Sequence, residues 1–242
     1  MVGFFRYGLQ YGDYLLEIAL LGVVVYRSFW RRRADVFLFL ASLVAIDVVF
    51  RPVVLYRYGV GSHEYFYTYW LSNITLQLAA FLLVCSFFRS ACLQNQKTWH
   101  VLRLALPTVF LLMVAISGIS IWHKYSELST SFNFINELSQ YLYFACLVLN
   151  TLLFIMMQYV EVADDHLSML VCGLGLQFAG PAAGMAVVVL AHGQQYAREA
   201  SGFIEQLCTL GMLATWLYAV TRVSRTAPRP VREEPGIVEQ AA

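Results

Sequence analysis

Stretches of about 20 mostly apolar residues recur along this chain, and no other feature limits its fold as strongly. A helix needs about that length to cross the hydrocarbon core of a bilayer. Within lipid, a helix also satisfies its own backbone hydrogen bonds, which an irregular segment cannot do. We therefore expect an all-α polytopic membrane bundle. Seven stretches qualify as transmembrane helices: Leu9–Phe29, Ala34–Leu55, Tyr65–Phe88, Val101–Ile121, Phe132–Tyr159, Leu167–Ala191 and Phe203–Thr221.

Composition supports this assignment and excludes several other classes. Of the 242 residues, 60% are apolar and 13% are charged, whereas soluble domains average about 45–50% apolar and about 25% charged residues. A disordered chain would instead be polar and rich in charge. The net charge of +1 provides no basic field for nucleic acid, so we expect no nucleic-acid partner.

The connections between the expected spans are short, and none could hold a separate domain. The first span lacks the basic segment and the small-residue cleavage site of a secretory signal, so we expect it to be retained. Residues 1–221 are therefore expected to form one seven-helix domain. Residues 222–242 contain three of the six prolines, Pro228, Pro230 and Pro235, and are expected to form a disordered, basic cytoplasmic tail.

Lysine and arginine in the short loops predict the orientation, because cytoplasmic loops carry an excess of both. Eleven fall on one side of the expected bundle and four on the other. We therefore expect the N-terminus outside and the C-terminus in the cytoplasm. The eleven are Arg27, Arg31, Arg32, Arg33, Arg89, Lys97, Arg103, Arg222, Arg225, Arg229 and Arg232, and the four are Arg6, Arg57, Lys124 and Arg198.

The sequence contains no motif of well-known chemistry. It has no P-loop, zinc-protease or serine-hydrolase signature, and no nucleophile–base pair is apparent, so an enzyme is disfavoured. The five cysteines form no C-x-x-C motif and none falls in an expected outer loop, so we expect neither a disulfide framework nor a metal site. Lys97 and Lys124 lie in loops, which leaves no lysine for a retinal. The sequence predicts no cofactor.

Polar side chains inside the expected spans are the strongest functional signal, because a charge at mid-membrane costs about 2.5–3.5 kcal/mol on insertion scales. On the predicted orientation most of them fall in the outer half of the membrane, which favours a polar pocket that opens outward. Arg51 would bind an anionic group of a small molecule, and the carboxylates an amine or a cation. The predicted ligand-binding residues are Glu17, Asp47, Arg51, Asn73, Gln77, Gln140 and Gln177.

Structural roles stay open for the charged residues of these spans. Asp47 and Arg51 are spaced i, i+4 and can pair on one helix face, which would hold the first three spans together. Glu137 and Glu205 lie near the ends of their spans and can reach the headgroups or water.

The sixth expected span contains signals for close packing and for a break. Gly180 and Gly184 form a small-x-x-x-small face that lets two helices approach closely. Pro181 leaves a carbonyl without its usual donor, which can bend the helix or provide a ligand. These three residues are therefore expected to act in helix packing or as a hinge.

The third expected span opens with Tyr65–Trp70, which reads Tyr-Phe-Tyr-Thr-Tyr-Trp, and rings of this kind favour the headgroup level. With this string and its layout of seven spans, the chain resembles uncharacterised bacterial seven-span integral membrane proteins. The resemblance implies a place in the bacterial cytoplasmic (inner) membrane and no particular activity, substrate or cofactor.

The sequence favours a sensor-like or accessory membrane protein that binds an unknown small molecule and acts through a protein partner. A proton- or cation-coupled carrier and a structural subunit of a larger membrane complex are the alternatives. The partner would dock on the cytoplasmic side or within the membrane, and basic loops there also favour anionic lipid headgroups. The expected docking residues are Arg31, Arg32, Arg33, Glu161, Asp164 and Asp165.

Overall fold

Helices account for nearly all of the chain that the computed structural model describes, and this part contains no strand. The structure describes residues 2–59, 62–92, 107–108, 111, 115, 119, 130–159, 165–191 and 194–222. Most of the fourth expected span lies outside these residues. The all-α class expected from the sequence is confirmed.

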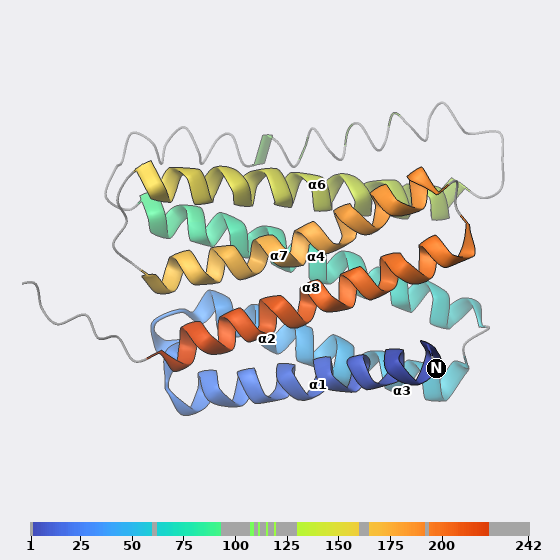
Figure 1. The fold of residues 1–242 in the computed structure, drawn as a ribbon, viewed down its shortest axis with the longest axis horizontal. Helices are drawn as coiled ribbons and strands as arrows, with labels where there is room; N and C mark the ends of the chain where they lie inside the picture. Colours follow the sequence, from blue (N-terminus) through green and yellow to red (C-terminus); the bar gives the residue numbers. More distant parts are fainter. Residues whose placement is uncertain are drawn as a thin grey trace, which may run out of the picture.

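Six helical rods are long and apolar enough to cross a membrane, which fits a multi-pass membrane protein. One of them is continuous through three segments, because α2 passes directly into the π-helical segment η2 and then into α3 (Figure 1). A short 3-10 turn, η1, precedes this rod. The elements are α1 (Val2–Tyr26), η1 (Phe29–Arg31), α2 (Ala34–Val44), η2 (Ala45–Phe50), α3 (Arg51–Tyr58), α4 (His63–Cys92), α6 (Thr130–Tyr159), α7 (Asp165–Leu190) and α8 (Gln195–Thr221).

The largest difference from the sequence prediction lies at the start of α8. The helix begins at Gln195, eight residues before the expected Phe203. Hydropathy detects the apolar part of a span and not the end of its helix, and the polar first turns of α8 still hold alanines, which favour a helix. The segment 195–202 was expected to be a loop, and that expectation is wrong.

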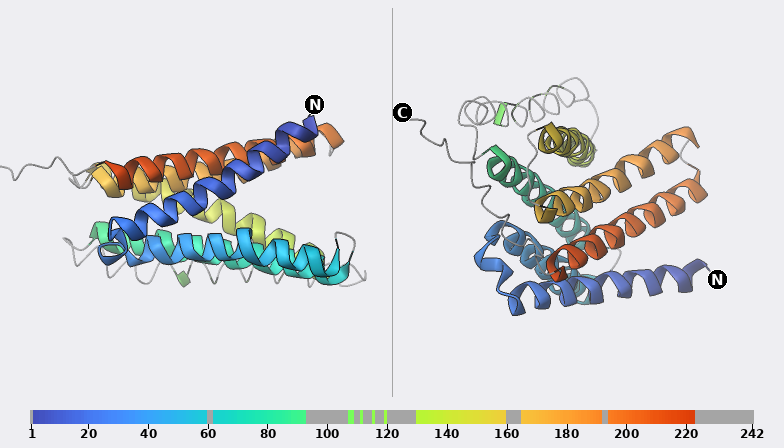
Figure 2. Two further views of the ribbon diagram at one scale, coloured as in Figure 1. Left: turned by 90° about the horizontal axis from the view of Figure 1, so that it is seen from below. Right: turned by 60° about the vertical axis from the view of Figure 1, so that its left-hand side comes forward.

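The helices form a closed ring. In order around it, α1 packs against α8, α8 against α7, α7 against α6, α6 against α4, α4 against α2, and α2 against α1. The α7–α8 contact is the most extensive of these, and α4 also touches α7 across the ring. Figure 2 (left) shows α7 and α8 on one side and α2, α3 and α4 on the other, with α6 between them and α1 crossing obliquely from the first side to the second. The ring therefore has an interior to which all six rods can contribute side chains.

The two ends of the bundle differ. The N-terminal end is where α1 begins, and the tail end is where α8 ends (Figure 1). Toward the N-terminal end, α1 diverges from α2, η2 and α3 (Figure 2, left). The buried apolar core occupies mainly the opposite half, which we call the tail half. Its largest fully buried side chains are Trp216, Phe87, Phe178, Leu20, Leu40, Leu142, Leu153, Leu167, Leu170, Leu174, Met212 and Leu213.

Hydrogen bonds between helices also gather at the tail end. Arg27 Nη1 donates to the carbonyl oxygen of Thr221 at 2.7 Å and joins α1 to the last turn of α8. The hydroxyl of Ser86 donates to Asp35 Oδ2 at 2.7 Å and joins α4 to α2. Trp216 Nε1 donates to the carbonyl oxygen of Leu170 at 2.9 Å, deep between α8 and α7. The tail half is thus the well-packed base of the ring.

The glycines of α7 explain how closely it approaches α8. A Cβ atom built on Gly180 would lie 2.8 Å from Cys208 Cβ, and one built on Gly184 would lie 3.2 Å from Ser201 Cβ. Gly173 meets the ring of Trp216 in the same way. Gly180 and Gly184 thus lie where α7 approaches α8 closely. Pro181 is buried within α7, which continues through it.

The π-helical segment η2 lies directly before Pro52. Proline provides no backbone N–H and its ring clashes with the carbonyl four residues back in an α-helix. The chain accommodates this with a wider turn, because the N–H of Arg51 bonds to the carbonyl oxygen of Ile46, five residues back. π-helical turns are frequent at functional sites, and this one carries Asp47 and immediately precedes Arg51.

Candidate functional site

Two carboxylic acids lie on the inner face of α1. Asp13 and Glu17 are four residues apart and so share one face of the helix. Both are buried, with 8% and 2% of their surface exposed. Asp13 Oδ1 and Glu17 Oε2 have no hydrogen-bond partner among the described residues. Two buried acceptors without donors are unusual, because buried polar groups are normally hydrogen-bonded.

The facing rod provides the cation. Arg51 Nη1 lies 2.5 Å from Asp47 Oδ1, which confirms the expected pairing, and both side chains are about four-fifths buried. Arg51 Nε donates to the hydroxyl oxygen of Ser72 on α4 at 3.1 Å. The guanidinium carbon also lies 4.7 Å from the centre of the Tyr69 ring, a cation–π distance. Arg51 is therefore held by α4 and by its own rod.

The cluster carries more negative than positive charge. Asp47, Asp13 and Arg51 all act electrostatically on the carboxyl of Glu17, so each of these three side chains lies near Glu17. With every group ionised, three carboxylates share one guanidinium in this part of the described structure. Arg51 Nη2 has no hydrogen-bond partner there either. Apart from Asp47 Oδ1, which is ion-paired with Arg51 Nη1, the unsatisfied groups of this acidic cluster (Asp13, Glu17, Asp47 and Arg51) are two acceptors and one donor.

A second polar contact joins α4 to α6. Gln77 Nε2 donates to the hydroxyl of Ser139, and both side chains are buried. Gln77 Oε1 has no partner in the described part of the chain. The hydroxyl of Tyr143 lies near Gln77 and is also influenced by Glu205 of α8, although α8 has no extensive contact with α6. Glu205 also acts electrostatically on Tyr69 of α4. Its carboxyl therefore acts on side chains of two helices that lie across the ring from α8.

The remaining predicted pocket residues lie elsewhere in the bundle. Gln177 of α7 is half-buried, and its Oε1 lacks a partner within the described chain. Asn73 and Gln140 are half-buried on α4 and α6. The structure thus brings Glu17, Asp47 and Arg51 together and seats Gln77 against Ser139. The part of the chain that the structure describes contains no hydrogen bond or ion pair from Asn73, Gln140 or Gln177 to these residues.

Polar side chains are divided unequally between the two halves. Of the seven that are buried in the described structure, Asn150 alone lies in the tail half. Its Nδ2 donates to the carbonyl oxygen of Val171 at 3.0 Å. The other six are Asp13, Glu17, Ser72, Gln77, Ser139 and Ser201. They lie between the N-terminal end of the bundle and about the middle of their helices, and we call this part the polar half.

A groove of about 300 Å³ lies away from the acidic cluster, between α2 and α4. None of the seven predicted pocket residues lines it. Its walls are mostly apolar, and the polar residues among them are Asp35 and Ser42. The lining residues are Asp35, Leu38, Phe39, Ser42, Ala79, Leu82 and Leu83.

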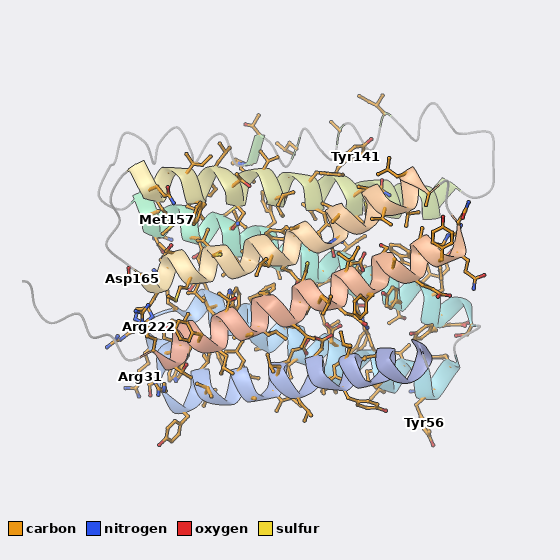
Figure 3. The ribbon with its side chains drawn as sticks, in the orientation of Figure 1. Arg31, Tyr56, Tyr141, Met157, Asp165 and Arg222 are labelled. Atoms are coloured by element: carbon orange, nitrogen blue, oxygen red, sulfur yellow. The ribbon has the colours of Figure 1, made fainter. Side chains whose placement is uncertain are left out.

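The expected docking residues lie at the tail end, as far as the structure describes them. Arg31 and Arg222 lie at this end with Asp165, whereas Tyr56 lies at the other (Figure 3). Arg31 and Arg32 are exposed, as is Asp165 in the first turn of α7. Arg33 Nη1 donates to the hydroxyl of Ser90 at 2.7 Å, so it also joins η1 to α4. Glu161, Asp164 and the side chain of Glu137 lie outside the described residues.

Sequence reasoning missed three members of the site. Asp13 had an available signal, its i, i+4 spacing from Glu17. Tyr69 was assigned to the interfacial aromatic string, and Ser72 has a side chain too common in helices to stand out. In the residues that the structure covers, no three His, Cys, Asp or Glu side chains come together as a metal site. Compared with known protein families, curated proteins and solved structures, the chain matches none.

Proposed function

We propose that this chain is a seven-span membrane protein with its N-terminus outside, which binds a small molecule between its helices and acts as a sensor-like or accessory subunit. The observation that carries the proposal is the buried carboxyl of Glu17, which has an oxygen without a hydrogen-bond partner among the described residues. Such a group normally has a hydrogen-bond or charge partner. A ligand would provide one.

The span count is supported by the directions of α4 and α6. Gln77 of α4 contacts Ser139 of α6, and further along, Cys92 Sγ lies 3.8 Å from Met156 Sδ. These two neighbouring helices therefore run parallel, and the end of one is separated from the start of the other by the length of the bundle (Figure 1). Parallel neighbours need a connection that returns across the bilayer. Residues 93–129 contain the fourth apolar stretch, which would serve.

The orientation is supported by the arginines of the described structure. Two exposed ones, Arg57 and Arg198, lie near the N-terminal end. The excess of basic residues at the tail end favours that end as the cytoplasmic one. The arginines there are Arg27, Arg31, Arg32, Arg33, Arg89 and Arg222.

A binding role is favoured over a carrier by the packing of the tail half. A carrier needs a polar route to both sides of the membrane, which is how intramembrane ionisable groups work in transporters. Below the acidic cluster the ring is filled by Leu20, Leu40, Phe87 and Trp216, all fully buried. Asn150, the buried polar group there, already donates to a backbone carbonyl. The polar half therefore resembles a site entered from one side.

Cysteine labelling in intact cells tests the orientation. Ser62 lies next to the start of α4 at the N-terminal end, and Ser28 is exposed at the tail end. Each is replaced by cysteine in a separate variant. A membrane-impermeant maleimide is expected to label Ser62→Cys and to label Ser28→Cys only after lysis. The unsubstituted protein gives the background from its own five cysteines. The opposite pattern would overturn the orientation.

A second pair of variants tests access to the site. Asp47 and Leu40 lie seven residues apart on one rod, and Leu40 is fully buried in the core. A small cationic methanethiosulfonate added outside is expected to modify Asp47→Cys and to leave Leu40→Cys unmodified. If both resist modification in intact cells and in detergent, the polar half is closed to small molecules and the binding role is wrong.

A further inference from the structure

The unsatisfied atoms of the acidic cluster specify a type of ligand, an inference that rests on the binding role proposed above. We propose that Asp13 and Glu17 hold a protonated primary amine. Both carboxyls are more than nine-tenths buried, and each has an oxygen without a donor in the described structure. They lie one helical turn apart, where a single ammonium group with three N–H donors can reach both.

Arg51 does not take the place of this amine. Arg51 Nη1 is paired with Asp47, and its Nε donates to Ser72. The ring of Tyr69 covers the guanidinium face. Arg51 thus neutralises one carboxylate and leaves Asp13 and Glu17 without a cation among the described side chains. A buried charge without a partner is strongly unfavourable in a membrane, so a positive ligand would stabilise the folded protein.

The ligand needs N–H donors as well as charge. Glu17 Oε2 and Asp13 Oδ1 are hydrogen-bond acceptors, and charge-assisted hydrogen bonds are about twice as strong as neutral ones. A quaternary ammonium group has the same charge but no N–H, so it would leave both oxygens unsatisfied. The free Nη2 of Arg51 can donate to a hydroxyl or carbonyl oxygen that the ligand carries near its amine. An amino alcohol has donors for the two carboxyls and an acceptor for Nη2.

Ethanolamine and choline form a matched pair of probes, because choline is the N-trimethyl form of ethanolamine. The intact purified protein is heated with each compound, with sodium chloride at the same ionic strength as the control. At about ten times Kd, ethanolamine is expected to raise Tm by roughly 3–6 °C. Choline and sodium chloride are expected to raise it far less. Ethylamine, which lacks the hydroxyl, should bind more weakly than ethanolamine.

Variants connect binding to the two carboxyls. Glu17→Gln and Asp13→Asn each remove one charged acceptor, and either is expected to weaken ethanolamine binding by about 10- to 100-fold. Both replacements remove an uncompensated charge from the interior, so folding should survive. Glu199→Gln is the matched control, because Glu199 is exposed near the start of α8, and it should bind ethanolamine as the unsubstituted protein does.

Three outcomes would overturn the amine site. One is an equal shift of Tm by ethanolamine, choline and sodium chloride, which would mean that protons or salt alone satisfy the cluster. The second is ethanolamine binding that survives both Glu17→Gln and Asp13→Asn. The third is no shift at any concentration of the three compounds. Because these measurements use solubilised protein, they are independent of the labelling in cells, so a failure of the amine site can be distinguished from a failure of the binding role.

Discussion

Asp47 and Arg51 form an ion pair of 2.5 Å within one helical rod, at the point where the helix widens to pass Pro52. The pair faces α4, where Ser72 and Tyr69 contact the same guanidinium. The arginine thus links a local irregularity of one helix to its neighbour, and it is the side chain on which the charge balance of the polar half depends.

Arg51→Gln is expected to destabilise the protein strongly. It leaves the Asp47 carboxylate beside Asp13 and Glu17 with no cation in the described cluster. Breaking a buried ion pair from one side typically costs about 3–5 kcal/mol, and the lower end applies here because both side chains remain about one-fifth exposed. Thermal or denaturant unfolding in detergent measures the effect.

The double variant Asp47→Asn, Arg51→Gln provides the contrast for that measurement. It removes both charges of the pair and should be more stable than Arg51→Gln alone. Arg57→Gln is the control at an exposed arginine of the same helix and should change stability little. A double variant that is less stable than the single one would contradict the charge argument.

Ser139→Ala is expected to loosen the contact between α4 and α6. The substitution removes the acceptor of the buried Gln77 amide, and hydrogen bonds between membrane helices are worth about 0.6 kcal/mol on average and up to about 1.7 kcal/mol. Thr75→Ala is a suitable comparison, because Thr75 is exposed and its hydroxyl donates within α4 to the carbonyl oxygen of Leu71. Equal unfolding midpoints for the two variants would argue against the contact.

Gly180→Ala is expected to lower stability by about 1–3 kcal/mol, the range for an overpacked core. The added Cβ would lie 2.8 Å from Cys208 Cβ and 3.3 Å from the Glu205 backbone, so α7 and α8 must separate. Gly22→Ala is the control, because nothing lies within 4 Å of its added Cβ. The unfolding midpoints of the two variants are compared. If Gly180→Ala leaves the midpoint unchanged, α7 and α8 do not approach each other so closely.

Arg27→Gln is expected to fray the last turn of α8. Arg27 donates to the carbonyl oxygen of Thr221, and its charge lies at the negative end of the helix dipole, an interaction of about 0.3–1 kcal/mol. Hydrogen–deuterium exchange should speed up at the end of α8 and stay unchanged in the core. Arg31→Gln, an exposed neighbour, should leave that exchange as it is. If exchange at the end of α8 is as slow in Arg27→Gln as in Arg31→Gln, Arg27 does not cap α8.

Hydropathy was a sound guide to the fold, because the apolar length of a span follows from the thickness of the bilayer. Six of the seven expected spans correspond to helices of the structure, and the remaining one falls mostly outside the described residues. The start of α8 escaped prediction because Gln195–Gly202 is polar and still helical. Sequence carries little information about a helix that continues beyond the apolar core.

The site was predictable only where its members lie on one helix. Spacing alone paired Asp47 with Arg51, and the same reasoning could have joined Asp13 to Glu17. Contacts between helices depend on the order of the ring, which hydropathy does not contain. For that reason the cover of Arg51 by Tyr69 and the bond from Gln77 to Ser139 were not foreseen.

The order of the ring has a consequence for biosynthesis. Because α1 packs against α8 as well as α2, its polar face meets one of its two shielding neighbours only after almost the whole described chain has left the ribosome. Until α8 is made, Asp13 and Glu17 would stay beside the insertion machinery or at the bilayer surface and not in the hydrocarbon core. Synthesis of α8 would therefore be the event that lets the first helix settle into lipid.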